Sequence, residues 1–350
     1  MSELSGLTCP APVTSGDRVL LAHGEGGRLT RRLIRELLLP AFANDYLRPL
    51  ADGALLPAAG GRLVMTTDGS VVSPLFFPGG DIGKLAVHGA INDLASCGAD
   101  PLYLSLAFIL EEGLPIETLR RVVVSIAAAS RACGIPVVTG DTKVVPHGMA
   151  DGLYLTTTAI GSQRAGIDWS ARRVRPGDRV IVTGTLGEHG LAVLAAREGF
   201  ELVGEGLVSD SAPLHELAKC LDACGEAVHF VRDPTRGGVA AVLHELSEAA
   251  GVSIVVDEPA LPVTSAVHGA CELLGLDVLH VANEGKLVVV VDPDAAEAAL
   301  TRLRRHPLGR AAAAVGRITS ASNPGVLIRG GLGALRMLDE PNGAPLPRIC

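Results

Sequence analysis

Residues 76–84 read FFPGGDIGK, two aromatic residues followed by a glycine-rich turn and the start of an apolar run. The Pro-Gly-Gly turn predicts a reversal of the chain, and the residues after Asp81 predict a helix over 82–97. Backbone N–H groups and the helix dipole at such an N-terminus favour an anion, and Asp81 and Lys84 are placed there. The segment therefore predicts a phosphate-binding turn at the start of a helix.

Strands and helices are predicted on both sides of this turn. The 42 glycines cluster between apolar β-branched runs, a pattern typical of a mixed α/β chain. A second helix is expected after Pro115, over 117–133, ending at Gly134. The remaining elements are strands over 62–67, 102–110, 137–139, 153–160, 179–183, 252–256, 286–291 and 326–328, and helices near 190–198, 238–250 and 294–305.

The chain is long enough for two domains followed by a tail. Its 350 residues exceed the usual size of one domain, and the composition changes over 164–177. We expect an N-terminal α/β domain over 1–165, a C-terminal α+β domain over 166–338 and a flexible tail over 339–350. The tail is rich in Pro and Gly, and about eleven extended residues reach roughly 36–40 Å.

Composition excludes several classes of protein. Hydrophobic residues make up 48% and charged residues 19%, and the formal net charge is -8, so no basic surface is expected for nucleic acid. No run approaches the ~18 apolar residues of a membrane span, and no secretion signal begins the sequence. We expect a cytoplasmic protein without a membrane partner. Seven cysteines, an odd number, predict free thiols rather than a disulfide framework.

Familiar catalytic motifs are absent from the sequence. Residues 79–85 are one short of a P-loop, and Leu85 stands where that motif needs Ser or Thr. His215-Glu216 and His244-Glu245 each lack the second histidine of a zinc-protease helix. These absences leave a different polyphosphate site as the best interpretation.

Acidic residues beside Gly, Thr or Asn suggest such a site. Carboxylates on converging loops are the ligands that Mg²⁺ shares with nucleotide phosphates, and more than one ion could be held. The glycine-rich opening 23–27 could present backbone N–H groups to phosphate oxygens. A single Asp-Gly pair is equally typical of a turn, and a glycine-rich stretch of a linker. The acidic positions are Asp52, Asp68, Asp81, Asp93, Asp141 and Asp233.

Seven runs of this sequence resemble the HypE family of hydrogenase maturation factors. They are residues 66–68, 76–87, 92–94, 140–145, 232–238, 282–286 and the terminal Pro347-Arg348-Ile349-Cys350. The resemblance extends from about Ser15 to Cys350. It implies a two-domain aminoimidazole ribonucleotide synthetase-like architecture, α/β plus α+β, with ATP and Mg²⁺ bound and the N-terminal domain pairing in a homodimer.

The resemblance also implies a reaction. A carbamoyl group delivered by the carbamoyltransferase HypF becomes a thiocarboxamide on the C-terminal cysteine. ATP phosphorylates its oxygen, and loss of phosphate leaves a thiocyanate. The cyanide then passes to iron held by the HypC–HypD complex, for the active site of [NiFe]-hydrogenase.

Residue roles follow from the same resemblance. Cys350 would carry the group, Glu284 would act as the base, and Lys143 would stabilise developing charge. The implied nucleotide contacts are Gly24, Gly26, Gly27, Asp81, Lys84, Asn92, Gly140, Thr142, Arg232 and Arg236. The implied metal ligands are Asp52, Asp68, Asp93, Asp141 and Asp233.

Other interpretations of the sequence stay open. A small-molecule kinase or selenophosphate synthetase of the same fold would stay active without Cys350. A non-catalytic scaffold switched by nucleotide would present the tail without turning over ATP. At single positions, Glu284 could be a turn carboxylate, Lys143 a surface charge, and Arg232 or Arg236 the partner of a local carboxylate.

Overall fold

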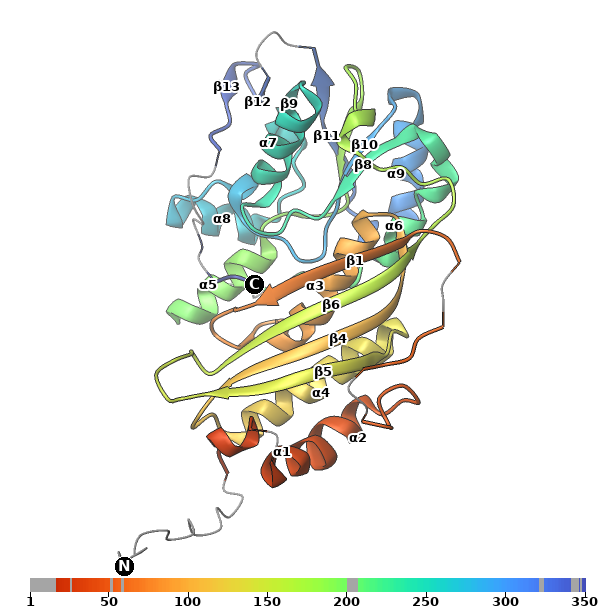
Figure 1. Ribbon diagram of the computed structural model, residues 1–350. Helices are drawn as coiled ribbons and strands as arrows, with labels where there is room; N and C mark the ends of the chain where they lie inside the picture. The colour runs from red at the N-terminus through yellow and green to blue at the C-terminus, as the bar shows by residue number, and fades with distance from the viewer. Residues whose placement is uncertain are drawn as a thin grey trace, which may run out of the picture.

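The computed structural model describes residues 17–25, 27–50, 53–57, 60–199, 207–320, 324–340, 346 and 348–350. Two sheets, each covered by helices, lie one above the other in Figure 1 and are joined by residues 164–178. In the described ranges, no helix is both long and apolar enough to cross a membrane.

The N-terminal sheet has the strand order β1-β6-β4-β5. Its strands are β1 (Leu63–Ser70), β4 (Ala99–Glu111), β5 (Val137–Val145) and β6 (Leu153–Gln163). β4 and β5 are parallel, and the helix α4 (Ile116–Cys133) makes the crossover between them. The other two pairs are antiparallel, so β1 and β5 form opposite edges of this sheet.

The segment 76–84 forms the turn that the sequence predicts. β2 (Phe76–Phe77) pairs with β3 (Gly80–Asp81), and α3 (Ile82–Ser96) follows directly. Oδ1 of Asp81 accepts the N–H groups of Gly83 and Lys84 at 2.8 and 3.1 Å, which caps the helix. The helix positions predicted for α3 and α4 are confirmed, and α4 ends at Gly134 with φ 70°.

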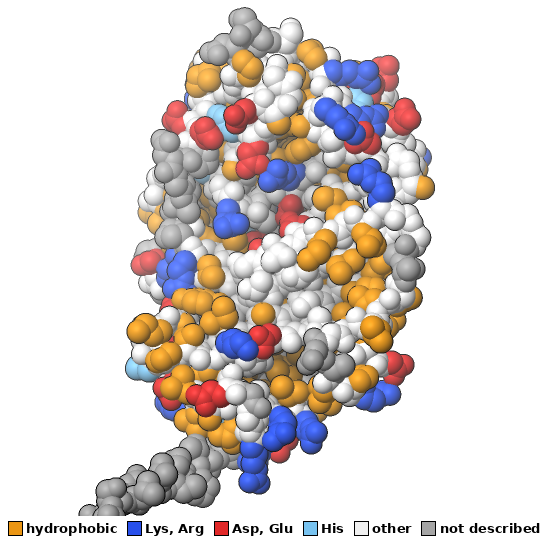
Figure 2. Space-filling view, in the orientation of Figure 1, with side chains coloured by type: hydrophobic (Ala, Val, Ile, Leu, Met, Phe, Trp, Pro, Cys, Tyr) orange, Lys and Arg blue, Asp and Glu red, His pale blue; other side chains and the backbone are white. Residues whose placement is uncertain are grey.

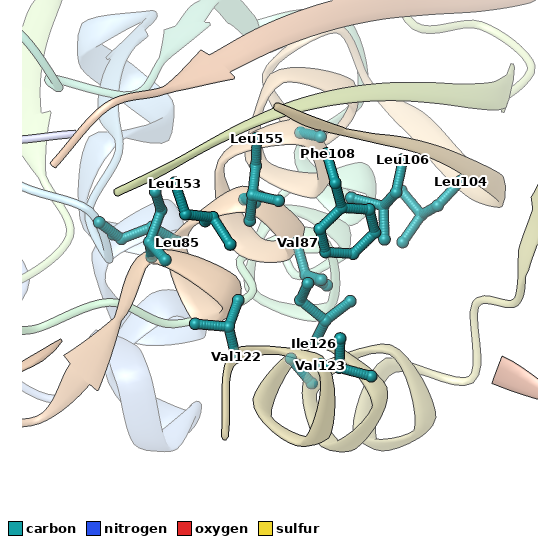
Figure 3. Packing of buried hydrophobic residues seen from close by; sticks show 14 of the residues in the cluster. Leu85, Val87, Leu104, Leu106, Phe108, Val122, Val123, Ile126, Leu153 and Leu155 are labelled. Carbon is teal, nitrogen blue, oxygen red and sulfur yellow. The ribbon is translucent and has the colours of Figure 1, made fainter. Parts of the chain in front are cut away.

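Helices cover one face of this sheet. α3 and α4 bury a core with the strands, in which Leu106, Phe108, Val123 and Ile126 interlock as Figure 3 shows. The other face of the sheet is turned toward the viewer in Figure 1. β1 alternates accordingly, and on that face Leu63 and Met65 are 61% and 68% exposed.

A short helical segment, which the sequence did not reveal, lies beside β5 and α4. It consists of η1 (Leu21–His23), α1 (Arg28–Leu33), the π-helix η2 (Ile34–Leu38) and α2 (Leu39–Phe42). After η1 the chain passes so close to β5 that a Cβ on Gly24 would lie 2.4 Å from the backbone nitrogen of Val144. Only glycine fits this approach.

The C-terminal sheet has the strand order β13-β12-β9-β11-β7-β10-β8. Val180 and Val182 pack toward one core with α7, while Ile181 packs toward a second core with α6 and α9. The strands are β7 (Arg179–Val182), β8 (Val228–Arg232), β9 (Ser253–Asp257), β10 (Val288–Val291), β11 (Ala313–Thr319), β12 (Gly325–Arg329) and β13 (Leu335–Met337). The α-helices are α5 (Glu188–Glu198), α6 (His215–Lys219), α7 (Gly238–Ala250), α8 (Ser265–Leu274) and α9 (Ala296–Arg305). The 3-10 segments are η3 (Ala171–Arg173), η4 (Asp222–Ala227), η5 (Glu258–Ala260), η6 (Val278–His280), η7 (Pro293–Ala295) and η8 (Pro307–Gly309).

Helix α3 ties the two sheets together. The Asn92 amide nitrogen donates to the carbonyl oxygens of Ala212 and Glu284, both at 3.1 Å, and its oxygen accepts the N–H of Leu214 at 2.8 Å. Asn92 is fully buried, so these bonds satisfy a side chain that water cannot reach. The loops of the second domain are thereby fixed against the first.

Candidate active site between the two sheets

The chain end lies between the two sheets. Figure 1 marks it between α5 and the arrowhead of β1. A main-chain carboxylate oxygen of Cys350 accepts the N–H of Val71 at 3.1 Å, and the carbonyl oxygen of Arg348 accepts the N–H of Ser73 at 3.2 Å. Ile349 is 3% exposed and belongs to the core of the first domain. The terminal thiol is therefore docked at the junction of the domains.

Glu284 and Asp68 lie beside this thiol, and Asp93 and Asp233 lie near Glu284. Asp68 comes from β1 and Asp93 from α3, where its Oδ2 accepts the hydroxyl of Thr66 at 2.6 Å. Asp233 follows β8, and Glu284 precedes β10. Strands and a helix from both domains thus bring together four residues that lie far apart in the sequence.

A glycine makes room for the first of these carboxylates. A Cβ on Gly89, one turn before Asp93 in α3, would lie 2.7 Å from Oδ2 of Asp68. An alanine at this position would therefore push the carboxylate of Asp68 out of the group. The small residue in α3 is part of the architecture of the site.

Burial and like charges raise the pKa values of Glu284, Asp233 and Asp93 in this group. Glu284 is 3% exposed, and burial followed by repulsion from Asp68 raises its pKa well above the usual value. Burial, with Asp93 second, raises the pKa of Asp233 to about 7. Burial and the nearby Glu284 also raise the pKa of the Cys350 thiol, which Arg236 opposes. Carboxylates held in this way are strong bases.

The group has the character of a cation site. Oε1 of Glu284 is buried without a hydrogen-bond partner among the described residues. Hard oxygen donors that repel one another fit Mg²⁺, which would offset their charge. In the ranges that the structure covers, no three His, Cys, Asp or Glu side chains already form a metal site, so phosphate oxygens would have to complete the shell. Figure 2 shows acidic side chains inside a hollow between the two halves, with Lys and Arg side chains at its rim.

Asp210 holds the loop that carries Glu284, and sequence reasoning missed it. Its carboxylate accepts the N–H groups of Glu284 and Gly285 at 3.0 and 3.2 Å, and the ammonium group of Lys286 at 2.9 Å. A Cβ on Gly285 would overlap the carbonyl oxygen of Asp210, at 1.9 Å. The Asn-Glu-Gly-Lys run at 283–286 identified this loop as a candidate, but no sequence motif marked Asp210 as the residue that holds it.

Other predicted residues lie at the opposite edge of the N-terminal sheet. Asp141 and Lys143 are inside β5, not after a strand as the sequence suggested, because pairing with β4 continues to Val145. Three strand spacings separate this edge from β1, roughly 14 Å. Asp141 and Lys143 are 60% and 64% exposed and 3.1 Å apart, and Lys143 lowers the pKa of Asp141. Within one chain, Lys143 does not meet Cys350.

A cavity of about 720 Å³ lies at this second edge. It opens between the N-terminal helices and β5, and Arg31, Arg35 and the buried Thr142 contribute to its lining, with Gly140 and Asp141 beside them. Gly27 is the N-cap of α1, three residues before Thr30 of the lining. Two of the predicted phosphate contacts, Gly140 and Thr142, therefore line this cavity at the β5 edge, and not the site around the terminal thiol.

The remaining predicted contacts are engaged within the protein. The Asp81 carboxylate itself occupies the positive end of α3, and the Lys84 ammonium donates to the carbonyl of Gly79 at 2.8 Å. Arg232 pairs with Glu245 at 2.9 Å on the surface. Roles for these residues and for Asn92 in nucleotide binding stay predictions. Two further predicted residues, Gly26 and Asp52, lie outside the described residues.

Comparison with known proteins places this arrangement in a family. Residues 50–163 and 175–329 match the N-terminal and C-terminal domains of the AIR synthase related proteins. The carbamoyl dehydratase HypE of Cupriavidus necator is 50% identical over 346 residues, which cover 99% of this chain and 98% of that protein. The predicted two-domain architecture is confirmed.

Two solved structures extend the likeness. The hydrogenase maturation protein HypE in complex with ATP has a TM-score of 0.90 and 44% identity, covering 95% of this chain and 99% of that one. A HypE–HypF complex has a TM-score of 0.78 and 46% identity, covering 88% and 99%. The predicted family is confirmed: the chain belongs to the AIR synthase related proteins and, within them, to the carbamoyl dehydratase HypE family.

Proposed function

We propose that this protein uses ATP to dehydrate a carboxamide held on the sulfur of Cys350, leaving a thiocyanate. One observation supports the proposal most strongly: the terminal thiol is docked beside Glu284, within a group of buried carboxylates. The ATP complex of a relative and the activity named for its family agree with it.

The chemistry needs a phosphate acceptor and a base. The amide oxygen attacks the γ-phosphorus of ATP and ADP leaves, which converts a poor leaving group into a phosphate. The carbon–oxygen bond then breaks, the nitrogen gives up both protons, and a carbon–nitrogen triple bond forms. Glu284, with its raised pKa, would accept one nitrogen proton and the departing phosphate the other, and Arg236 would offset charge on that phosphate.

The carboxylates of Asp68, Asp93 and Asp233 would hold Mg²⁺, at most two of them on any one ion, with phosphate oxygens of the nucleotide completing its shell. When bound, the ion neutralises charge on the transferring phosphoryl group. A bound cation would also offset the carboxylate repulsion that helps to raise the pKa of Glu284. Glu284 could then work as a base in its ionised form.

The partners follow from the chemistry of the group that is carried. HypF would supply the carbamoyl group to Cys350 in the cytoplasm, and the HypC–HypD complex would accept the cyanide. Residues 339–350 would act as a swinging tail, separate from domains over 1–165 and 166–338. The complex of HypE with HypF is known for a relative and supports the first of these contacts.

A homodimer would bring the two edges of the N-terminal sheet into one site. Lys143 and Asp141 lie on the same face of the sheet as the exposed Leu63 and Met65. Pairing of two such faces would bury these apolar side chains and carry the β5 edge of one copy toward the β1 edge of the other. Lys143 would then act on the partner's Cys350 group.

Mass spectrometry tests the central proposal. The protein is incubated with carbamoyl phosphate, ATP, Mg²⁺ and HypF, and its C-terminal peptide is weighed. We expect one carbamoyl mass to appear and one water then to be lost, with release of ADP. Cys350→Ser should abolish both changes, whereas Cys220→Ser should leave them intact. Unchanged ADP release in Cys350→Ser would favour a different kinase or synthetase, and a thiocarboxamide that forms but is never dehydrated would favour the scaffold.

Mixed dimers test whether Lys143 acts across the interface. Lys143→Met and Glu284→Gln would each be inactive alone. In an equimolar mixture with random exchange, half of the dimers contain one copy of each variant. One of the two sites in such a dimer has both Lys143 and Glu284 intact, so about a quarter of all sites should be active. No recovery on mixing would argue against action in trans.

A further inference from the structure

We propose that Arg197 is a positioning residue, whose guanidinium clamps the docked chain end so that the thiol of Cys350 stays at Glu284. The inference rests on the proposed function and adds a residue that neither motif nor family resemblance had marked. Arg197 lies in the last turn of α5, in the second domain, and reaches the first domain and the tail together.

The contacts of this guanidinium join two segments of main chain. Nε of Arg197 donates to the carbonyl oxygen of Ser73 at 2.9 Å, and one terminal nitrogen donates to that of Arg348 at 2.7 Å. The N–H of Ser73 donates to the same Arg348 oxygen. A planar guanidinium presents its donors at fixed angles, so it sets the spacing of the two segments.

The backbone of the chain end is strained where Arg197 binds it. Arg348 has φ 53°, a left-handed conformation that crowds the Cβ of any residue but glycine. Such a conformation persists only where the surroundings hold it on several sides. Here the Arg348 side chain donates to Asp151 at 2.6 Å and to the Val71 carbonyl at 2.9 Å, while Arg197 and Ser73 hold its own carbonyl. This kink directs the last two residues toward the site.

His189 supports the same geometry from the core. It is fully buried, and its Nε2 lies 3.0 Å from the carbonyl oxygen of Ile349. A carbonyl only accepts, so Nε2 carries the proton, and Nδ1 accepts the hydroxyl of Ser209 at 2.8 Å. The ring of Phe77 packs edge-on against this imidazole. The main-chain oxygens of residues 348, 349 and 350 are thus each held by a donor from the body of the protein.

Arg197 contacts none of the reacting atoms, so its role is alignment. Loss of the clamp would free Arg348 to leave its strained conformation, and the thiol would move away from Glu284. Misplacement of a reacting group by about 1 Å can cost about a hundredfold in rate. The clamp also shields Cys350, because a docked end is closed to large reagents.

Alkylation of Cys350 measures docking without any catalysis. Full-length protein is treated with iodoacetamide, and modification of the C-terminal peptide is followed by mass spectrometry. Loss of a charge-assisted hydrogen bond predicts that Arg197→Met raises this rate by about tenfold, with Arg197→Lys between it and the wild type. Arg172→Met, at an exposed arginine paired with Asp168, is the matched control and should react as the wild type does.

A second readout separates alignment from mere stability. In single-turnover dehydration of protein already carrying the thiocarboxamide, Arg197→Met should be about ten- to a hundredfold slower, with ATP affinity unchanged and partial rescue by lysine. If Arg197→Met does not fold, Arg197→Lys, which keeps the charge but cannot donate to both carbonyl oxygens at the fixed angles of a guanidinium, should still be alkylated faster than the wild type. Alkylation rates within twofold of the Arg172→Met control would overturn the proposal. Failure of the proposed function would give a different result: the wild type would not dehydrate the group, but Arg197→Met would still be alkylated faster than the wild type.

Discussion

The two edges of the N-terminal sheet carry acidic residues in opposite environments. At the β1 edge, Asp93, Asp233 and Glu284 are mostly or wholly buried, and repulsion between carboxylates adds to the effect of burial on their pKa values. At the β5 edge, Asp141 is exposed beside Lys143, which lowers its pKa. The first arrangement costs stability, whereas the second costs almost none.

The difference shows where the chain concentrates its chemistry. Carboxylates that are buried close together are expected where they bind a cation or transfer a proton. Exposed ion pairs such as that of Asp141 and Lys143 are common on any protein surface. We therefore expect substitutions at the β1 edge to change activity and pH dependence strongly. Substitutions at the β5 edge should leave the stability of a single chain almost unchanged.

The largest effect is expected at Glu284. Glu284→Gln keeps the shape of the side chain but cannot accept a proton, so dehydration should slow by about 10²- to 10⁴-fold while ATP binding persists. Single-turnover mass spectrometry of the C-terminal peptide measures this rate. Glu216→Gln, at an exposed carboxylate paired with Lys219, is the control. A dehydration rate close to that of the wild type would remove Glu284 from the mechanism.

The next effect is expected on stability, at Asp210. Burial acts to raise its pKa, but Lys286 and the surrounding donors hold the pKa below its usual value. Asp210→Asn would leave the ammonium group of Lys286 buried without its counter-ion, which costs about 3–5 kcal/mol in the free energy of unfolding. Urea unfolding measures the loss. Asp168→Asn, at an exposed pair, should lose at most about 1 kcal/mol, and a similar small loss in Asp210→Asn would contradict the expectation.

A third prediction concerns pH and Asp233. Its pKa is raised from 3.8 to about 7 in the folded protein, chiefly by burial, so the folded state binds this proton more tightly than the unfolded chain. The stabilisation that protonated Asp233 contributes is fully present below its pKa in the unfolded chain, and it is lost as the pH rises through its folded pKa of about 7. Asp233→Asn cannot ionise. Its stability relative to the wild type should therefore grow by roughly 2–3 kcal/mol between about pH 5 and about pH 8, in protein freed of metal. Thermal unfolding at both pH values measures this difference, and a constant offset would show that Asp233 ionises freely.

The smallest effect is expected at Lys143 within one chain. Removing an exposed ion pair in Lys143→Met should change the free energy of unfolding by less than about 1 kcal/mol. The pKa of Asp141 should return toward its ordinary value, as carboxylate titration by nuclear magnetic resonance would show. The small stabilisation from this pair is present above the ordinary pKa and is lost as the pH falls. A loss of several kcal/mol would contradict the expectation that the exposed pair at the β5 edge contributes little to stability.

Local sequence patterns predicted the long elements of the fold well. Helices α3 and α4 have a clear turn or proline before them and a glycine after, so their bounds differ from the prediction by one residue. β8, an edge strand of the C-terminal sheet, and β11, in the middle of that sheet, were missed. β11 reads Ala-Ala-Val-Gly-Arg-Ile-Thr, and its small residues become a strand only because β7 and β9 lie on either side.

The site was predicted in part, for a physical reason. Asp68, Asp93, Asp233, Glu284 and Cys350 stand in runs that are recognisable along the chain, and the fold brings them together. Asp210, His189 and Arg197 act through main-chain groups of distant residues, and such contacts leave no local pattern. Which edge of the sheet Asp141 and Lys143 occupy depends on the strand order, which spacing along the chain does not encode.

The buried amide of Asn92 limits how this molecule can open. Rotating one domain away from the other would break three hydrogen bonds to backbone groups, two of them fully buried. A hinge at this junction is therefore costly, whereas the chain end is held by separate contacts, of which those of the Arg348 side chain are exposed and can release first. Entry and exit of the reacting group should proceed by undocking the last residues, with the two domains moving through turnover as a single rigid unit.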